Sequence, residues 1–92
     1  MDLNGAVAVV TGGSGGLGGR ICHALADSRA NVAVLYGGSR EKAEDVAGQL
    51  QAKGVQSEAV QCDVTDPQMV ASMATLILDR FGRIDILIND AG

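Results

Sequence analysis

Short runs of apolar, mostly β-branched residues alternate along the chain with longer stretches in which apolar residues recur every three or four positions. The short runs cover residues 6–10, 32–36, 59–62 and 84–88. A short apolar run is typical of a buried strand, and the longer spacing is typical of an amphipathic helix. The pattern therefore predicts four strands that alternate with three helices.

Each helical stretch has an apolar face that is expected to pack on the sheet. In the first helix, the predicted inward positions are Leu17, Ile21, Leu25 and Ser28. In the second helix, which Gly54 ends, they are Ala43, Val46, Ala47 and Leu50. In the third helix, which Gly82 ends, they are Val70, Met73, Ala74, Ile77 and Phe81. Asp66 is expected to cap the third helix, with Pro67 at its first position.

The order of the elements predicts an α/β fold with a Rossmann-type, doubly wound parallel sheet. Right-handed crossovers put the first two helices on one face and the third on the other, which gives the strand order 3-2-1-4. Ligands bind such sheets where the strand order reverses, at the carboxyl ends of the first and fourth strands. The sequence has no linker, so we expect residues 1–92 to be one dinucleotide-binding half-domain, truncated after the fourth strand, with no second domain.

A glycine-rich segment, TGGSGGLG at residues 11–18, lies between the first strand and the first helix. Gly12 can form the tight turn, Gly16 lets the backbone approach a diphosphate, and Gly18 allows close packing. The N–H groups at the start of the helix then face the phosphates. A glycine loop alone is weak evidence because flexible turns are also rich in glycine. Its position between a strand and an amphipathic helix favours nucleotide binding.

The charge and composition exclude several other classes of function. Eleven acidic and seven basic residues give a formal net charge of −4, and the basic residues are scattered, which disfavours nucleic-acid binding. No apolar stretch approaches the ~20 residues of a membrane span, and no signal-peptide pattern is present. We therefore expect a cytoplasmic protein with no membrane contact. Cys22, Cys62 and the single histidine, His23, lack metal-ligand spacing, so we expect no metal site and two buried, reduced thiols.

Three motifs in the same order resemble those of the short-chain dehydrogenase/reductase family. They are the Thr-Gly-x-x-x-Gly-x-Gly spacing from Thr11 to Gly18, CDVTDP at 62–67, and NDAG at 89–92 in place of an Asn-Asn-Ala-Gly turn. The segment VAVLYGGSREKAEDVAGQLQAKG is most similar to the 3-oxoacyl-acyl-carrier-protein reductases. This resemblance implies an oxidoreductase that transfers hydride between NADPH and a carbonyl or hydroxyl substrate, in that subfamily in fatty acid biosynthesis.

The resemblance also implies which residues hold the cofactor. Those on the diphosphate and nicotinamide-ribose side are Gly12, Ser14, Gly15, Gly16, Leu17 and Gly18. Asp63 and Val64 would contact the adenine, although Asp63 can also be read as a simple turn residue after a strand. The opposite wall is formed by Asn89, Asp90, Ala91 and Gly92. Asp90 departs from the family pattern: it is harmless if the contact uses a backbone carbonyl, but weakens binding if an amide donor is needed.

The end of the second strand favours NADP(H) over NAD(H). NAD-binding folds usually place an acidic residue there for the ribose 2′-hydroxyl. This chain instead has Tyr36, an expected cofactor contact on the adenosine side, followed by two glycines. Ser39 and Arg40 can instead bind a 2′-phosphate. The alternative is that Ser39 caps the second helix and Arg40 is solvated. The basic residue that the family often has inside the glycine loop is missing, since Gly15 stands there, so NAD(H) stays open.

No catalytic residue can be assigned in these 92 residues. In the family, a Tyr-x-x-x-Lys segment with a Ser and an Asn follows the fourth strand, and here Tyr36 has Arg40 four positions later. We expect the isolated chain to bind nucleotide weakly without turnover. The alternatives are a non-catalytic nucleotide-binding fragment, such as an engineered half-domain, and, ranked lower, a methyltransferase-like fold. An exposed edge with Ile84, Ile86 and Ile88 predicts self-association through the fourth strand.

Overall fold

The computed structural model describes residues 2–90, which form seven elements in the predicted order. They are β1 (Val7–Thr11), α1 (Gly16–Asp27), β2 (Asn31–Tyr36), α2 (Arg40–Gln51), β3 (Ser57–Gln61), α3 (Pro67–Phe81) and β4 (Ile86–Asn89). The predicted strand bounds are off by one or two residues. The third strand begins earlier than its apolar run because Ser57 is fully paired in the sheet, where its hydroxyl donates to the Val32 carbonyl at 2.8 Å.

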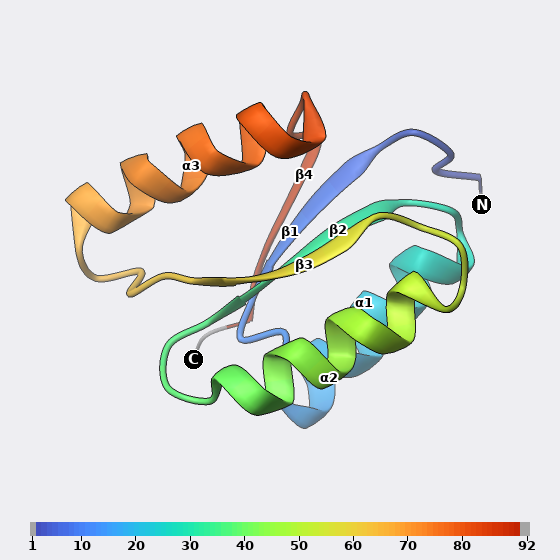
Figure 1. Cartoon of the computed structure of the whole chain (residues 1–92), viewed down its shortest axis with the longest axis horizontal. Helices are drawn as coiled ribbons and strands as arrows, with labels where there is room; N and C mark the ends of the chain where they lie inside the picture. The colour runs from blue at the N-terminus through green and yellow to red at the C-terminus, as the bar shows by residue number, and fades with distance from the viewer. Residues whose placement is uncertain (1, 91–92) are drawn as a thin grey trace.

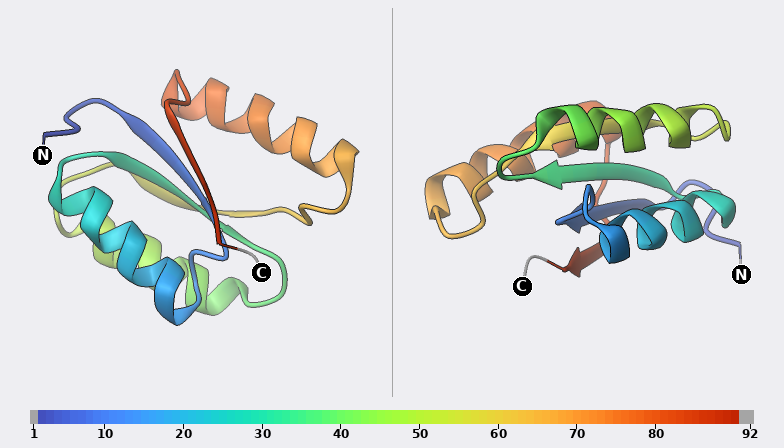
Figure 2. Two further views of the ribbon diagram at one scale, coloured as in Figure 1. Left: turned by 180° about the vertical axis from the view of Figure 1, so that it is seen from behind. Right: turned by 90° about the horizontal axis from the view of Figure 1, so that it is seen from below.

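The four strands form one parallel sheet in the order β3-β2-β1-β4, which confirms the predicted topology. Figure 1 shows α1 and α2 on one face and α3 on the other, and Figure 2 shows the same layers from behind and from below. The switch point therefore lies between β1 and β4. Within residues 2–90, no helix is long and apolar enough to cross a membrane.

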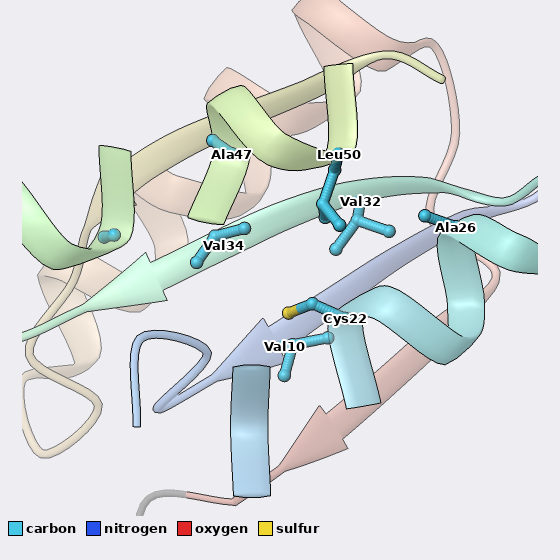
Figure 3. Close-up of a cluster of buried hydrophobic side chains, with 8 residues drawn as sticks. Val10, Cys22, Ala26, Val32, Val34, Ala47 and Leu50 are labelled. Carbon is cyan, nitrogen blue, oxygen red and sulfur yellow. The ribbon is translucent and has the colours of Figure 1, made fainter. Parts of the chain in front are cut away.

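Both faces of the two central strands are buried, which explains why their sequences are apolar without alternation. On one face, Val10, Val32 and Val34 pack with residues of α1 and α2 (Figure 3). On the other face, Val9 and Leu35 pack with Ile77 of α3. The sheet thus separates two small aliphatic cores.

The prediction for the inward face of α1 is confirmed only in part: Ile21 and Leu25 pack against the core, but the face is centred one position further along the helix. The buried residues of this helix are Gly18, Cys22 and Ala26, whereas Leu17 is 62% exposed. Ile21 and Leu25 are only partly buried, and Ser28 is the C-terminal cap. The helix lies so close to the sheet that only small side chains fit beneath it. The larger aliphatic side chains flank this contact.

The residues predicted to begin and to end α3 are confirmed. The Asp66 carboxylate accepts the Gln68 N–H at 2.9 Å and the Met69 N–H at 3.4 Å, and Pro67 is the first helical residue. Gly82 ends the helix with a φ of 87°, a left-handed conformation that favours glycine. The last strand can therefore turn back toward β1 directly after the helix.

Asp85 joins the start of β4 to the start of β1 through hydrogen bonds. One carboxylate oxygen accepts the Val7 N–H at 2.9 Å, the other accepts from the Arg83 guanidinium at 2.7 Å, and the Asp85 N–H donates to the Val7 carbonyl. The hydrogen bonds from Arg83 and Val7 lower the pKa of this carboxyl group. The single polar residue within the last apolar run is thus explained by the register of β4 on β1.

Candidate functional site

A cavity of about 340 Å³ opens at the carboxyl ends of β1, β2 and β3. It is lined by Thr11, Gly12, Leu35, Tyr36, Gly37, Cys62, Asp63 and Val64. These residues come from three segments that are far apart in the sequence. Four of the predicted site residues, Gly12, Tyr36, Asp63 and Val64, are therefore brought together. The cavity lies at the carboxyl ends of the strands, where open α/β sheets bind ligands, on the β2 and β3 side of the switch point between β1 and β4.

The glycine loop has the geometry that its spacing predicts. Gly12 has a φ of 66°, the left-handed conformation of a tight turn. A Cβ atom on Gly18 would lie 2.1 Å from the Gly12 carbonyl oxygen, so the helix packs against the turn without room for a side chain. A Cβ atom on Gly16 would meet nothing within 4 Å. The loop backbone is therefore tightly packed at Gly18 and has open space beside it at Gly16.

The start of α1 carries an uncompensated positive end. Gly15 is the N-cap and supplies no side-chain hydrogen bond, and the first turn has no acidic residue. The first N–H groups of a helix have no acceptor within it, and the helix dipole favours an anion beside them. Ser14 is half-buried and Leu17 is exposed at this helix end. Neither lines the 340 Å³ cavity, so these two lie beside it.

Gly13 is a close-packing glycine that the sequence analysis did not single out. A Cβ atom there would lie 2.9 Å from Val34 Cγ1 and 3.1 Å from Cys22 Sγ. The Cys22 thiol is buried in this contact, and burial raises its pKa to about 11. A sequence signal for this role was present, because Gly13 belongs to a glycine-rich run in which Gly12, Gly16 and Gly18 already had assigned roles.

Thr11 was not among the predicted cofactor contacts, although it lines both the main cavity and its smaller neighbour. Its buried hydroxyl lies 3.0 Å from Asn89 Oδ1 and 3.3 Å from the Ile88 carbonyl oxygen as donor, and accepts the Asp90 N–H at 2.9 Å. The end of β1 is thereby tied to the turn that follows β4. Because Asp90 is engaged through its backbone N–H, the change from Asn at this position leaves that contact intact.

We expect Thr11→Val to lower the free energy of unfolding by about 1–3 kcal/mol, because it leaves the Asn89 amide oxygen and the Asp90 N–H without their buried partner. Valine keeps the shape of threonine, so little packing is lost. Urea denaturation of both proteins measures the change. Thr11→Ser, which keeps the hydroxyl, is the control, and a loss as large as that of the valine variant would contradict the hydrogen-bonding role.

Asp63 forms a local turn at the mouth of the cavity. Its Oδ1 accepts the Thr65 N–H at 2.9 Å and the Thr65 hydroxyl at 2.7 Å, and these bonds lower the pKa of the carboxyl group. The reading of Asp63 as a turn residue is thus confirmed. The same side chain also lines the cavity, so the turn presents an ionised carboxylate to any molecule bound there.

The second strand ends in an open, acid-free loop. Gly37 and Gly38 are exposed, and Cβ atoms on them would meet nothing within 4 Å. Ser39 occupies the N-cap position of α2, as its alternative reading predicts, but its side chain makes no capping hydrogen bond. Arg40 is not simply solvated, because its Nε donates to Glu44 Oε1 at 2.7 Å.

The remaining predicted residues divide into two groups. Asn89 lies with Thr11 and Val64 on a neighbouring, smaller cavity of about 170 Å³. Ala91 and Gly92 lie outside the described residues. Cys62 borders the main cavity but is 4% exposed, and burial raises the pKa of its thiol. Among residues 2–90, no three His, Cys, Asp or Glu side chains are grouped as metal ligands.

A parallel sheet in the order β3-β2-β1-β4 with a glycine loop at its switch point defines the Rossmann-type class of nucleotide-binding folds. Within this class, a family model described as short chain dehydrogenase matches residues 6–92. The chain belongs to this family.

Individual relatives agree with the family assignment. The 3-oxoacyl-acyl-carrier-protein reductase FabG of Staphylococcus aureus is 47% identical over 85 residues, which are 92% of this chain and 35% of the relative. Versicolorin reductase 1 of Aspergillus parasiticus is 42% identical over 90 residues, or 98% of this chain and 34% of the relative. The chain thus spans about a third of the length of these relatives.

Solved structures of dehydrogenases superpose closely on this chain. A short chain dehydrogenase from Burkholderia cenocepacia in complex with NADP has a TM-score of 0.94 at 40% identity, covering 100% of this chain and 38% of the other. An NAD⁺-bound xylitol dehydrogenase also has a TM-score of 0.94, at 34% identity, covering 100% of this chain and 35% of the other. The same fold is therefore found with either dinucleotide.

Proposed function

We propose that residues 1–92 form the NADP(H)-binding portion of an oxidoreductase that transfers hydride between NADPH and a carbonyl or hydroxyl substrate. The observation that carries this proposal is the glycine loop. Its turn is closed by the contact of Gly18 with Gly12, and its open side at Gly16 lies at the positive end of α1. A backbone that is bare of side chains at a helix N-terminus suits a diphosphate.

The contacts proposed for the dinucleotide follow the layout of the site. Gly12, Ser14, Gly16 and Leu17 would lie along the diphosphate and the nicotinamide ribose. The Asp63 carboxylate and the Val64 backbone would contact the adenine in the main cavity, which both residues line. The wall on the β4 side is assigned to Asn89, Asp90, Ala91 and Gly92.

NADP(H) is the preferred cofactor in this proposal, with NAD(H) as the alternative. The loop after β2 has no carboxylate at Gly37 or Gly38 to accept hydrogen bonds from a ribose 2′-hydroxyl. A carboxylate there would also repel a 2′-phosphate. Ser39 and Arg40 supply a hydroxyl donor and a guanidinium close to the same loop. Gly15, at the family's frequent basic position, supplies no positive charge.

The proposed substrate class follows the relatives and is a 3-oxoacyl group on acyl carrier protein. The 92 residues contain no Tyr-x-x-x-Lys segment, and the one tyrosine, Tyr36, lies on the main cavity beside Gly37. Among the described residues, we therefore expect no acid to be placed to protonate a developing alkoxide beside the nicotinamide. We propose that the chain by itself binds the dinucleotide without catalysing hydride transfer.

A thermal shift experiment tests this proposal. At a ligand concentration of about one hundred times Kd, the stabilisation is about 2.7 kcal/mol, enough to raise Tm by several degrees. We expect NADPH to raise Tm more than NADH does, and S-adenosylmethionine to have no effect. NADPH absorbance with a 3-oxoacyl thioester should stay constant. Stabilisation by S-adenosylmethionine alone would instead support the methyltransferase-like alternative, and no stabilisation by either dinucleotide would contradict the proposal.

Self-association through β4 is proposed from the exposed surface of that strand. β4 is an edge of the sheet, and Leu87 is 65% exposed, whereas Ile86 and Ile88 are half-buried and Ile84 lies outside the strand. Within the strand, the exposed apolar residue is therefore Leu87 rather than Ile86 or Ile88, and Ile84, just before the strand, is 36% exposed. An unprotected strand edge invites pairing with another strand. Sedimentation equilibrium over a range of concentrations measures this, and a monomer at every concentration would contradict it.

A further inference from the structure

The guanidinium that is proposed to bind the 2′-phosphate already has an anionic partner. Arg40 Nε donates to Glu44 Oε1 at 2.7 Å across one turn of α2. This contact raises the pKa of Arg40, which stays positively charged. The two side chains are 76% and 56% exposed, so nothing buries the pair or fixes it in place. An exposed pair of this kind is weak and can exchange partners.

The pair faces a different cavity from the one that holds the predicted adenine contacts. Arg40 and Glu44 line a groove of about 380 Å³ between α2 and β3. Gly37 lines the 340 Å³ cavity instead, and Tyr36 lies between the two because it lines both. The ion pair thus holds the guanidinium beside Glu44, one turn further along α2, where both residues line the groove.

Other carboxylates nearby do not share this role. Glu58 lines the same groove but is paired with Arg80. Glu41 lies in the first turn of α2, next to Arg40 in sequence, and no ion pair joins it to Arg40 within the described residues. Glu44 is therefore the carboxylate that competes for the Arg40 guanidinium.

We infer that Glu44 is a specificity-determining residue that weakens NADP(H) binding by competing with the 2′-phosphate for Arg40. This inference rests on the proposed function. A guanidinium binds phosphate and carboxylate through the same planar set of N–H groups, and Glu44 already accepts from Nε, so a phosphate that binds the Nε side must displace the Glu44 carboxylate. NAD(H) lacks the 2′-phosphate and leaves the Arg40–Glu44 pair undisturbed. Glu44 should therefore lower the affinity for NADP(H) without changing the affinity for NAD(H), which reduces the preference of the chain for NADP(H).

Glu44→Gln tests the inference, with Glu41→Gln as the matched control. Glu41 carries the same charge on the same helix without the pair, so it reports the general effect of removing one negative charge. We expect Glu44→Gln to tighten NADPH binding about threefold to fivefold at low salt, and Glu41→Gln to change it less than about twofold. NADH affinity should be unchanged in both variants. Isothermal titration calorimetry measures the six dissociation constants of the unmodified chain and the two variants for NADPH and NADH.

The same substitution in an Arg40→Ala background shows whether the effect passes through the guanidinium. In that background, Glu44→Gln is expected to leave NADPH affinity unchanged, because there is no longer a shared partner. An equal gain from Glu41→Gln, a gain that persists without Arg40, or a loss of NADPH affinity in Glu44→Gln would overturn the inference while the proposed function stands. If the unmodified chain binds neither dinucleotide, the proposed function fails and this inference fails with it.

Discussion

Replacing Gly18 with alanine is expected to lower the free energy of unfolding by about 3 kcal/mol and to abolish dinucleotide binding. The new Cβ atom would lie 2.1 Å from the Gly12 carbonyl oxygen and 3.0 Å from Gly13 Cα, both of which belong to the backbone. Neither atom can move aside as the end of a flexible side chain would. The glycine turn or the start of α1 must therefore shift. Urea denaturation and calorimetry with NADPH measure the two losses.

Two other glycines provide the controls for this prediction. Gly48 lies within α2, and a Cβ atom there meets nothing within 4 Å, so Gly48→Ala should stabilise the chain by about 0.5–1 kcal/mol. Gly16→Ala should keep the fold, since its Cβ also meets nothing, but should weaken NADPH binding if the diphosphate approaches this backbone. Equal stability losses in Gly18→Ala and Gly16→Ala would contradict the packing described for the loop.

Ile77→Ala is expected to destabilise the chain by about 2–5 kcal/mol, the cost of a large-to-small substitution in a core. Ile77 is the one fully buried residue of α3 and packs against the face of the sheet that carries Val7, Val9 and Leu35. A chain of this size has a total stability of about 5–14 kcal/mol, so this loss is a large part of it. Circular dichroism during urea denaturation measures the effect.

The neighbouring residue in the sequence is the control for Ile77. Leu78 is 50% exposed, so Leu78→Ala should change the free energy of unfolding by less than about 0.5 kcal/mol. Asp63 and Val64 lie in the connection between β3 and Pro67, the first residue of α3. Unfolding of α3 should therefore also disturb the part of the main cavity that these two residues line. A small effect of Ile77→Ala would show that α3 contributes little to the fold.

The layers and the strand order could be predicted because both follow from general rules for parallel α/β sheets, and the apolar pattern of this chain satisfies those rules in only one way. Apolar runs mark the parallel strands, and right-handed crossovers then leave one arrangement of the helices. The inward face of α1 could not be predicted in the same way. Leu17, Ile21 and Leu25 have the right spacing, but the approach of the helix to Gly13 leaves room only for Gly18, Cys22 and Ala26.

In the candidate site, too, some residues could be predicted from the sequence and others could not. Asp63 and Val64 were predicted from the family motif that follows the third strand, and Gly12 and Tyr36 from their places at the ends of the first and second strands. Parallel strands bring their carboxyl ends together, which is why these residues meet. The bonds of Thr11 to Asn89 and Asp90 join residues that are 78 and 79 positions apart. The Arg40–Glu44 pair has ordinary helical spacing, but only the structure reveals that it faces a second groove.

A crystal structure of the chain with bound NADPH tests the central claim most directly. The predicted result is a diphosphate in hydrogen-bonding contact with the backbone N–H groups at the start of α1, beside Gly16, with the adenine in contact with the Asp63 carboxylate and the Val64 backbone. A dinucleotide bound elsewhere, with the glycine loop bare or closed by its own main chain, would contradict it.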